Sequence, residues 1–211
     1  MTTSTTERNR PLIGLIGKKR SGKNATAREL ARHGYIEAAF ADPLRDMALA
    51  IDPVVGWQDD PEGDPDESKP IYYSEALAVY GYEGSKEAFP EFRRFLQRLG
   101  TEGVREVLGE QYGLRERLGD DVWIVLAEQQ IDAATDPLVF TDVRFPNEAE
   151  LIERKGGITA RVVRPGLAPS GDTHPSETAL DEYATRYEVV NGGTLADLRD
   201  AVGKLVEWLR R

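Results

Sequence analysis

The stretch Gly17-Lys-Lys-Arg-Ser-Gly-Lys-Asn24 decides the fold, because it matches the pattern G-x-x-x-x-G-K-[ST] except at its last residue. An apolar run, Pro11 to Ile16, precedes it, and a helical pattern over 23–33 follows it. In this strand–loop–helix context, glycines let backbone amides curl around phosphates, and the start of the helix adds its positive dipole. We call residues 17–24 the phosphate loop. It predicts a nucleotide site in which Lys23 reaches the β- and γ-phosphates. The competing interpretation is a glycine-rich turn with a solvated basic run.

Outward from this loop, short apolar runs alternate with helical patterns. The expected strands are residues 11–16, 35–40, 137–141, 158–163 and 187–190. The expected helices are 23–33, 42–51, several over 73–118, one capped by Asp120 or Asp121, 146–155 and 194–210. This alternation predicts a doubly wound α/β fold with a five-stranded parallel sheet. Ligands in such sheets bind beyond the carboxyl ends of the strands, where the phosphate loop, Asp42 and Asp142 fall.

The sequence also predicts which residue caps one helix and which faces of two others are buried. Asp42 should cap the helix that begins at Pro43, since aspartate followed by proline is a common helix start. The apolar residues Phe92, Phe95, Leu96 and Leu99 recur at spacings of three and four and predict one buried helical face. Val122, Val125 and Leu126 are expected to face inward.

Composition excludes several classes of site. The chain has 211 residues, no cysteine, two histidines and a net charge of −10. Without cysteine there is no disulfide, thiolate nucleophile or Cys-type zinc site. The negative charge argues against binding of a nucleic-acid polymer, which requires net phosphate neutralisation. No apolar run approaches the roughly 20 residues of a membrane span, so we expect a cytoplasmic protein without membrane attachment.

Charge is unevenly distributed along the chain. Residues 52–69 hold seven acids and one lysine, and we expect an exposed loop there. Residues 17–28 hold five bases and no acid. Lys18 and Lys19 are expected to be solvated, whereas Arg20 lies within the phosphate loop. The cationic segment predicts a local site for a small anion.

Four further segments narrow the function. Ala41-Asp-Pro-Leu-Arg45 follows the second strand, and Phe95-Leu-Gln-Arg-Leu-Gly-Thr-Glu102 lies in the helical stretch. Thr141-Asp-Val-Arg-Phe-Pro-Asn-Glu148 follows the third strand, and His174-Pro-Ser-Glu177 precedes the fifth. Together with the phosphate loop, these segments resemble the phage-type deoxynucleoside monophosphate kinases over most of residues 11–195.

The resemblance implies transfer of the ATP γ-phosphate to a deoxynucleoside 5′-monophosphate (dNMP), with Mg²⁺. It implies a P-loop kinase fold in one domain over 11–211, after a disordered N-terminus, 1–10. The core would be 11–51 and 137–211, the helical NMP-binding insert about 52–136, and the lid about 165–186. If the gene is a phage's, the cytoplasm is that of the host. A homodimer is compatible with the resemblance and not required by it.

Each site residue has an expected role under this resemblance. The ATP phosphates would be held by Gly17, Arg20, Ser21, Gly22, Lys23, Asn24 and Ala25. Lys23, Asp142 and Arg144 would act in catalysis, with Asn24 and Asp142 near Mg²⁺, directly or through water. The acceptor would meet Asp42, Arg45, Arg94, Gln97, Thr101 and Trp123. His174, Ser176 and Glu177 would belong to the lid, and Asn191 to the adenine side.

Structural roles compete with several of these assignments. Asp142 can form an N-cap or a surface ion pair, Glu148 is favoured as a helix-start residue, and Trp123 is more often a core side chain. The segment ending at Thr194 can be a turn that caps the last helix. Two other functions compete as well: a small-molecule kinase that resembles dephospho-coenzyme A kinase, and a nucleotide-dependent switch without an acceptor.

Overall fold

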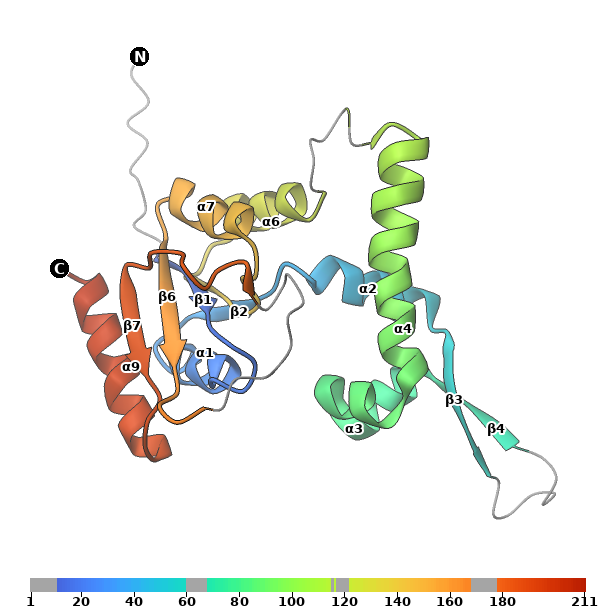
Figure 1. Cartoon of the computed structure of the whole chain (residues 1–211), viewed down its shortest axis with the longest axis horizontal. Helices are drawn as coiled ribbons and strands as arrows, with labels where there is room; N and C mark the ends of the chain where they lie inside the picture. Colours follow the sequence, from blue (N-terminus) through green and yellow to red (C-terminus); the bar gives the residue numbers. More distant parts are fainter. Residues whose placement is uncertain (1–10, 60–67, 115, 117–121, 168–177) are drawn as a thin grey trace. The chain divides into compact units, whose positions relative to one another are not determined.

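The chain forms two compact units in a computed structural model that describes residues 11–59, 68–114, 116, 122–167 and 178–211 (Figure 1). The first unit comprises Met1–Phe40 and Leu126–Arg211, and the second comprises Ala41–Val125. The units meet after residues 40 and 125, whereas the sequence predicted boundaries after residues 51 and 136. Residues 42–51 group with the insert because Ala48 is buried in the core of the second unit.

A five-stranded sheet forms the centre of the first unit. Its strands are β1 (Leu12–Ile16), β2 (Ile36–Ala38), β5 (Leu138–Phe140), β6 (Ile158–Val163) and β7 (Tyr187–Val190). They lie in the order β2-β5-β1-β6-β7, and every neighbouring pair is parallel. The expected five-stranded parallel sheet is therefore confirmed. The central strand β1 is buried along its whole length, as an apolar run between two helical layers should be.

Helices cover both faces of this sheet (Figure 1). Ile13 and Leu15 point to the face where α1 (Lys23–Ala31) and α9 (Leu195–Leu209) complete one apolar core. Gly14 points to the opposite face, where a Cβ atom would lie 3.1 Å from Ile152 of α7 (Pro146–Arg154). Because side chains alternate along a strand, these contacts establish the doubly wound arrangement.

The second unit is largely helical. Its elements are α2 (Asp42–Ile51), β3 (Val54–Asp59), β4 (Ser68–Tyr72), α3 (Tyr73–Ala88), α4 (Pro90–Arg98) and η1 (Leu99–Gln111), a π-helix. Phe92 and Leu96 are buried, and Phe95 and Leu99 pack beside them, which confirms the predicted helical face. The unit is thus organised around one face of α4.

Two expectations about the second unit are wrong. Residues 52–69 include β3 and the start of β4, which pair antiparallel, and are not simply an exposed loop; residues 60–67 lie outside the described part. Val55 is buried in the core of the unit and holds the hairpin to it, an effect that the acidic composition conceals. Asp42 is the first residue of α2, whose N-cap is Ala41, and its carboxylate pairs with Arg45.

The inward face of α6 (Val122–Ala133) also differs from expectation. Trp123 and Ala127 are buried, whereas Val122, Val125 and Leu126 are only partly covered. A Cβ atom on Gly100 would lie 3.8 Å from the Trp123 indole, so the largest apolar side chain of the helix takes the interior position. In the described residues, no helix has the length and apolar character needed to span a membrane.

Candidate active site

The phosphate loop follows β1, and three of its residues have positive φ angles. Gly17 has φ +153°, Arg20 has φ +67° and Gly22 has φ +107°. A Cβ atom on Gly17 would lie 2.6 Å from the carbonyl oxygen of Val162, so only glycine fits there. Arg20 adopts the left-handed region without being glycine, which is costly and common at ligand-binding loops. Gly22 is the N-cap of α1, so that the helix begins at Lys23.

Lys23 folds back over this loop. Its Nζ donates to the carbonyl oxygens of Gly17, at 2.5 Å, and Lys18, at 3.2 Å. The Thr26 hydroxyl donates to the Gly22 carbonyl. The Ser21 hydroxyl is buried and has no hydrogen-bond partner among the described residues. The loop therefore presents one ammonium group over a glycine-bounded curve at the positive end of a helix.

A depression beside the loop gathers cations from separate parts of the first unit. Its charged lining is Lys18, Lys23, Arg144, Arg161 and Asp181. Four cations and one carboxylate make the site suited to an anion. Lys18 is exposed, as expected, and its Nζ also lies 2.5 Å from an Asp181 oxygen. That ion pair ties the loop to the segment that follows residues 168–177.

Arg161 was missed by the sequence analysis. It extends from β6, and its guanidinium donates to the carbonyl oxygens of Leu180 and Tyr183, at 2.8 and 2.7 Å. Arg161 therefore holds the segment 180–183 beside the depression that it also lines. The available signal was an arginine inside an otherwise apolar strand, Ile158-Thr-Ala-Arg-Val-Val163.

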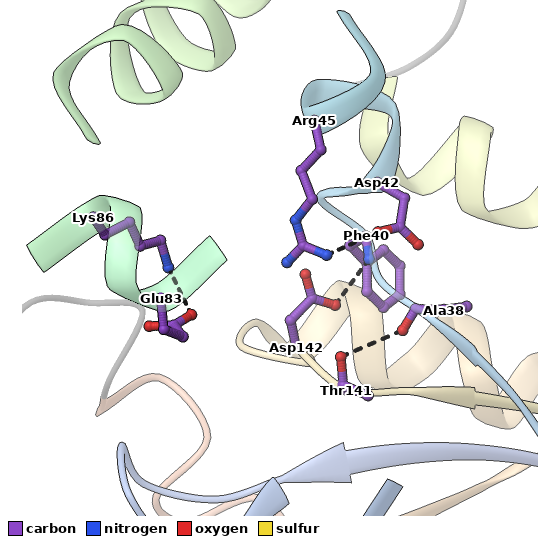
Figure 2. A network of polar contacts seen from close by, with 8 residues as sticks. All are labelled: Ala38, Phe40, Asp42, Arg45, Glu83, Lys86, Thr141 and Asp142. Carbon is purple, nitrogen blue, oxygen red and sulfur yellow. Dashed lines mark hydrogen bonds and ion pairs between the residues drawn. The ribbon is translucent and has the colours of Figure 1, made fainter. Parts of the chain in front are cut away.

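Asp142 lies where β5 ends (Figure 2). Its Oδ1 accepts a hydrogen bond of 2.8 Å from the backbone N–H of Phe40, which follows β2. The next residue but one, Arg144, is exposed, and its backbone N–H donates to Oε2 of Glu148 at 2.6 Å. Glu148 is buried and also accepts from the Phe145 N–H at 3.1 Å, so its favoured interpretation as a helix-start residue is confirmed.

Asn191 touches the phosphate loop from the end of β7. Its backbone N–H donates to Val163, and its Nδ2 donates to the Ser21 carbonyl at 2.9 Å. A Cβ atom on Gly22 would collide with this amide. Thr194 caps α9 by accepting from the Asp197 N–H, so the capping interpretation is confirmed. Asn191 therefore braces the loop, while its adenine-side role stays a prediction.

In the second unit, the predicted acceptor residues have different environments. Asp42 and Arg45 form an ion pair of 2.9 Å (Figure 2). Arg94, Gln97 and Thr101 are exposed on α4 and η1, and Arg94 pairs with Glu91. Trp123 is only 7% exposed, which favours its role as a core side chain. The predicted lid residues His174, Ser176 and Glu177 lie outside the described residues.

Comparison with known proteins decides the family. A protein of Acanthamoeba polyphaga mimivirus, named as a deoxynucleotide monophosphate kinase, is 32% identical over 191 residues, which cover 85% of this chain and 86% of that protein. The chain belongs to the deoxynucleotide monophosphate kinase family. It is therefore a kinase, an enzyme that transfers phosphoryl groups, as the sequence resemblance implied. No protein-family model matches the chain.

This member of the deoxynucleotide monophosphate kinase family is also similar to a second named relative and to a solved structure. The deoxynucleoside-5′-monophosphate kinase of Escherichia phage T5 is 31% identical over 117 residues, or 52% of this chain and 42% of that protein. A solved dephospho-CoA kinase from Campylobacter jejuni covers 95% of this chain at 12% identity and a TM-score of 0.42. At that TM-score, the likeness decides neither fold nor function.

Proposed function

We propose that the enzyme transfers the γ-phosphoryl group of ATP to deoxynucleoside 5′-monophosphates and releases ADP and deoxynucleoside diphosphates. The observation that supports this most is the cationic depression beside the phosphate loop, where Lys23 and Arg144 line one site. The names of the mimivirus and phage T5 relatives support a dNMP as acceptor.

The transfer requires charge neutralisation more than covalent catalysis. An oxygen of the acceptor phosphate forms a bond to the γ-phosphorus. The bond between the γ-phosphorus and the β–γ bridging oxygen breaks, and its electron pair leaves with ADP. Lys23 counters the charge that develops on the transferred group and the leaving oxygen. Arg144 offers a planar guanidinium that can hold phosphate oxygens in a fixed orientation.

The remaining loop residues position the donor. Backbone amides from Gly17 to Ala25 surround the ATP phosphates, with the start of α1 behind them. We assign Arg20 and the hydroxyl of Ser21 to the same ATP phosphates. Asn191 holds the loop through the Ser21 carbonyl, and we keep it on the adenine side of ATP.

The residues near the phosphate loop are compatible with a Mg²⁺ ion that is bound mainly by the nucleotide phosphates. Asp142 offers a carboxylate and Asn24 an exposed amide oxygen, whereas the described residues contain no group of three or more acids or histidines that could hold a metal by themselves. Mg²⁺ commonly binds through one or two carboxylates, water and substrate phosphates. When bound, it would neutralise phosphate charge and lower the barrier to transfer. Asp142 would hold its hydration shell.

Acceptor recognition belongs to the second unit. Arg45 and Arg94 supply cations, Gln97 and Thr101 supply exposed polar groups, and Asp42 can accept from a sugar hydroxyl. Gln97 can read a base edge because an amide offers both a donor and an acceptor. We retain Trp123 as a side chain that shapes this region from the interior.

A single assay separates this function from its alternatives. The protein is incubated with ATP and Mg²⁺, and with one dNMP, dephospho-coenzyme A or no acceptor. ADP together with a deoxynucleoside diphosphate is the expected result. Phosphorylation of dephospho-coenzyme A alone would replace the proposal with the other kinase. ADP formed equally in every arm, without a phosphorylated acceptor, would indicate a nucleotide switch.

A further inference from the structure

Arg161 lies one strand away from the residue at which the phosphate loop begins. In the register of the sheet, Arg161 of β6 pairs with Ile16 of β1, and Ile16 directly precedes Gly17. A Cβ atom on Gly17 would lie 2.6 Å from the carbonyl oxygen of Val162, the residue after Arg161. The end of β6 is therefore packed against the start of the loop, and strand pairing fixes Arg161 beside it.

The Arg161 side chain leaves the sheet on the face opposite α1 and α9. Its neighbour Val162 lies in the apolar core with those helices, and successive side chains of a strand alternate between faces. On the face of Arg161, a Cβ atom of Gly14 would lie 3.1 Å from Val143, the residue before Arg144. Arg161 and the segment that carries Arg144 therefore reach the depression from the same face of the sheet.

Two backbone carbonyls fix the orientation of the Arg161 guanidinium. Its Nη2 donates to the carbonyl oxygens of Leu180, at 2.8 Å, and Tyr183, at 2.7 Å. Hydrogen bonds from a charged donor are stronger than neutral ones, so they hold the planar group well. An arginine also carries donors on Nε and Nη1, and these have no hydrogen-bond partner among the described residues. The anchored guanidinium therefore keeps donors for a ligand.

The charge of Arg161 is not neutralised by any carboxylate within ion-pair distance among the described residues. Its two carbonyl partners orient the group without cancelling its charge. Asp181, the carboxylate of the depression, pairs with Lys18 instead. Lys23 and Arg144 add positive charge to the same lining. Like charges gathered at one site repel each other, and an anion that contacts them relieves this repulsion.

We propose that Arg161 is a further catalytic residue, whose Nε and Nη1 donors contact the γ-phosphoryl group of ATP. Lys23 reaches the β- and γ-phosphates, and it lines the depression together with Arg144 and Arg161. A guanidinium that carbonyls already orient can stabilise charge on the transferred oxygens without reorganising. Arg161 stays protonated throughout the transfer. This proposal rests on the proposed function, because it adds a contact to the group that is transferred.

The first experiment replaces Arg161→Met and measures steady-state kinetics with ATP and the best accepted dNMP. We expect kcat to fall roughly 10²-fold, as it does when a preorganised charge donor is removed from other active sites. The KM for the acceptor should stay unchanged. A kcat within about threefold of the parent value would overturn the proposal, because a donor to the transferred group contributes more than that.

Arg161→Lys tests the donors that the carbonyls leave available. Lysine keeps the charge, and its ammonium can still donate to both carbonyls, but it lacks the planar fork that offers Nε and Nη1. We expect this variant to recover only part of the lost kcat. Full recovery would show that holding residues 180–183 is sufficient, and would overturn the contact with the γ-phosphoryl group.

Arg164→Met is the matched control for charge. Arg164 directly follows β6, is exposed and is not among the residues that line the depression. Both methionine variants change the net charge of the protein by the same amount. Arg164→Met should leave kcat and both KM values unchanged. An equal fall of kcat in the two variants would indicate a general charge effect and would count against Arg161.

A binding measurement distinguishes a phosphate contact from a purely structural role. Calorimetry compares ATP with ADP in the parent and in Arg161→Met. The variant should bind ATP about tenfold more weakly, in keeping with one charge-assisted hydrogen bond, and should bind ADP as the parent does. A displaced segment 180–183 would disturb the loop through Lys18 and weaken both nucleotides. Equal losses for ATP and ADP would therefore refute contact with the γ-phosphoryl group.

Failure of this assignment and failure of the proposed function give different results. If the parent phosphorylates no dNMP, the proposed function is refuted, and the comparison of ATP with ADP still decides whether Arg161 contacts the γ-phosphoryl group. If the parent phosphorylates a dNMP and Arg161→Met does so at the parent rate, the assignment of Arg161 alone is refuted.

Discussion

At the scale of single residues, Lys23 has the sharpest assignment. Its ammonium donates to the loop carbonyls of Gly17 and Lys18, so hydrogen bonds hold the side chain over the loop. Such preorganisation matters because a donor aimed at developing charge contributes to catalysis without reorganising.

We predict that Lys23→Ala reduces kcat by roughly 10²- to 10³-fold, as loss of a single preorganised charge donor does in other enzymes. The partly exposed side chain packs into no core, so the fold should persist. Initial-rate kinetics and a thermal melt measure the two effects. Turnover near the parent value would mean that residues 17–24 do not hold the donor phosphates.

The brace from Asn191 gives a second residue-level prediction. Asn191→Ala removes the hydrogen bond to the Ser21 carbonyl, which we expect to raise the KM for ATP about fivefold, in keeping with one neutral hydrogen bond. Thr194→Ala, three residues along the same turn, should lower stability but spare that KM. Equal KM changes in the two variants would assign the effect to the turn as a whole.

At the scale of elements, the start of α9 should make the stability of the folded state depend on pH. The Asp197 carboxylate accepts hydrogen bonds from the backbone N–H of Thr194, at 2.6 Å, and from its hydroxyl, at 2.8 Å. These bonds, the backbone bond foremost, lower the pKa of Asp197 below its ordinary value of 3.8. A lowered pKa means that the charged carboxylate stabilises the folded state above pH 3.8, and that the contribution decays as the pH falls through the folded-state pKa.

We therefore predict that Asp197→Asn lowers the free energy of unfolding at pH 7 and that the difference from the parent shrinks at pH 3. Urea titrations at the two pH values measure it. A difference that stays constant or grows on acidification would show that the carboxylate charge is not what stabilises the start of α9.

Most of the helices and strands of the first unit could be predicted from the sequence. The strands and α1, α7 and α9 were predictable because each is encoded by its own periodicity and by local signals such as Gly17, Pro146 and Thr194. The β3–β4 hairpin was not, because one buried side chain, Val55, outweighs a polar composition. The same limit applies to the inward face of α6.

The candidate site was predictable only where a local motif encodes it. The phosphate loop, Asp142 and the structural role of Glu148 follow from short strings of sequence. The Lys18–Asp181 ion pair and the contacts of Arg161 join residues far apart in the chain, so only the sheet topology brings them together. The kink of α3 at Gly81 was likewise not indicated by any periodicity in the sequence.

At the scale of the whole molecule, the two units have separate cores, and this predicts separable defects. Phe92 is fully buried and stacked on Tyr73 in the second unit. Phe92→Ala should cost about 3–5 kcal/mol of that core's stability. Because the phosphate loop belongs to the first unit, we expect ATP binding to persist while the KM for the acceptor rises.

Hydrogen exchange resolved by segment and a nucleotide-binding titration check this prediction. Protection should fall over residues 41–125 and remain over 126–211. If Phe92→Ala abolished ATP binding and protection in both ranges together, the chain would unfold as a single cooperative body.

The position of β1 at the centre of the sheet has a consequence for how the chain folds as it is made. Its pairing partner β5, where Val139 lies beside Ile13, comes after the entire second unit in the sequence. Residues 41–125 are contiguous, so their contacts close with a small loss of chain entropy and can form as soon as that segment leaves the ribosome. The strand β1 is synthesised first, but it can pair only after β5 has been made. We therefore expect completion of the nucleotide-binding unit to be the slow, late step of folding during synthesis.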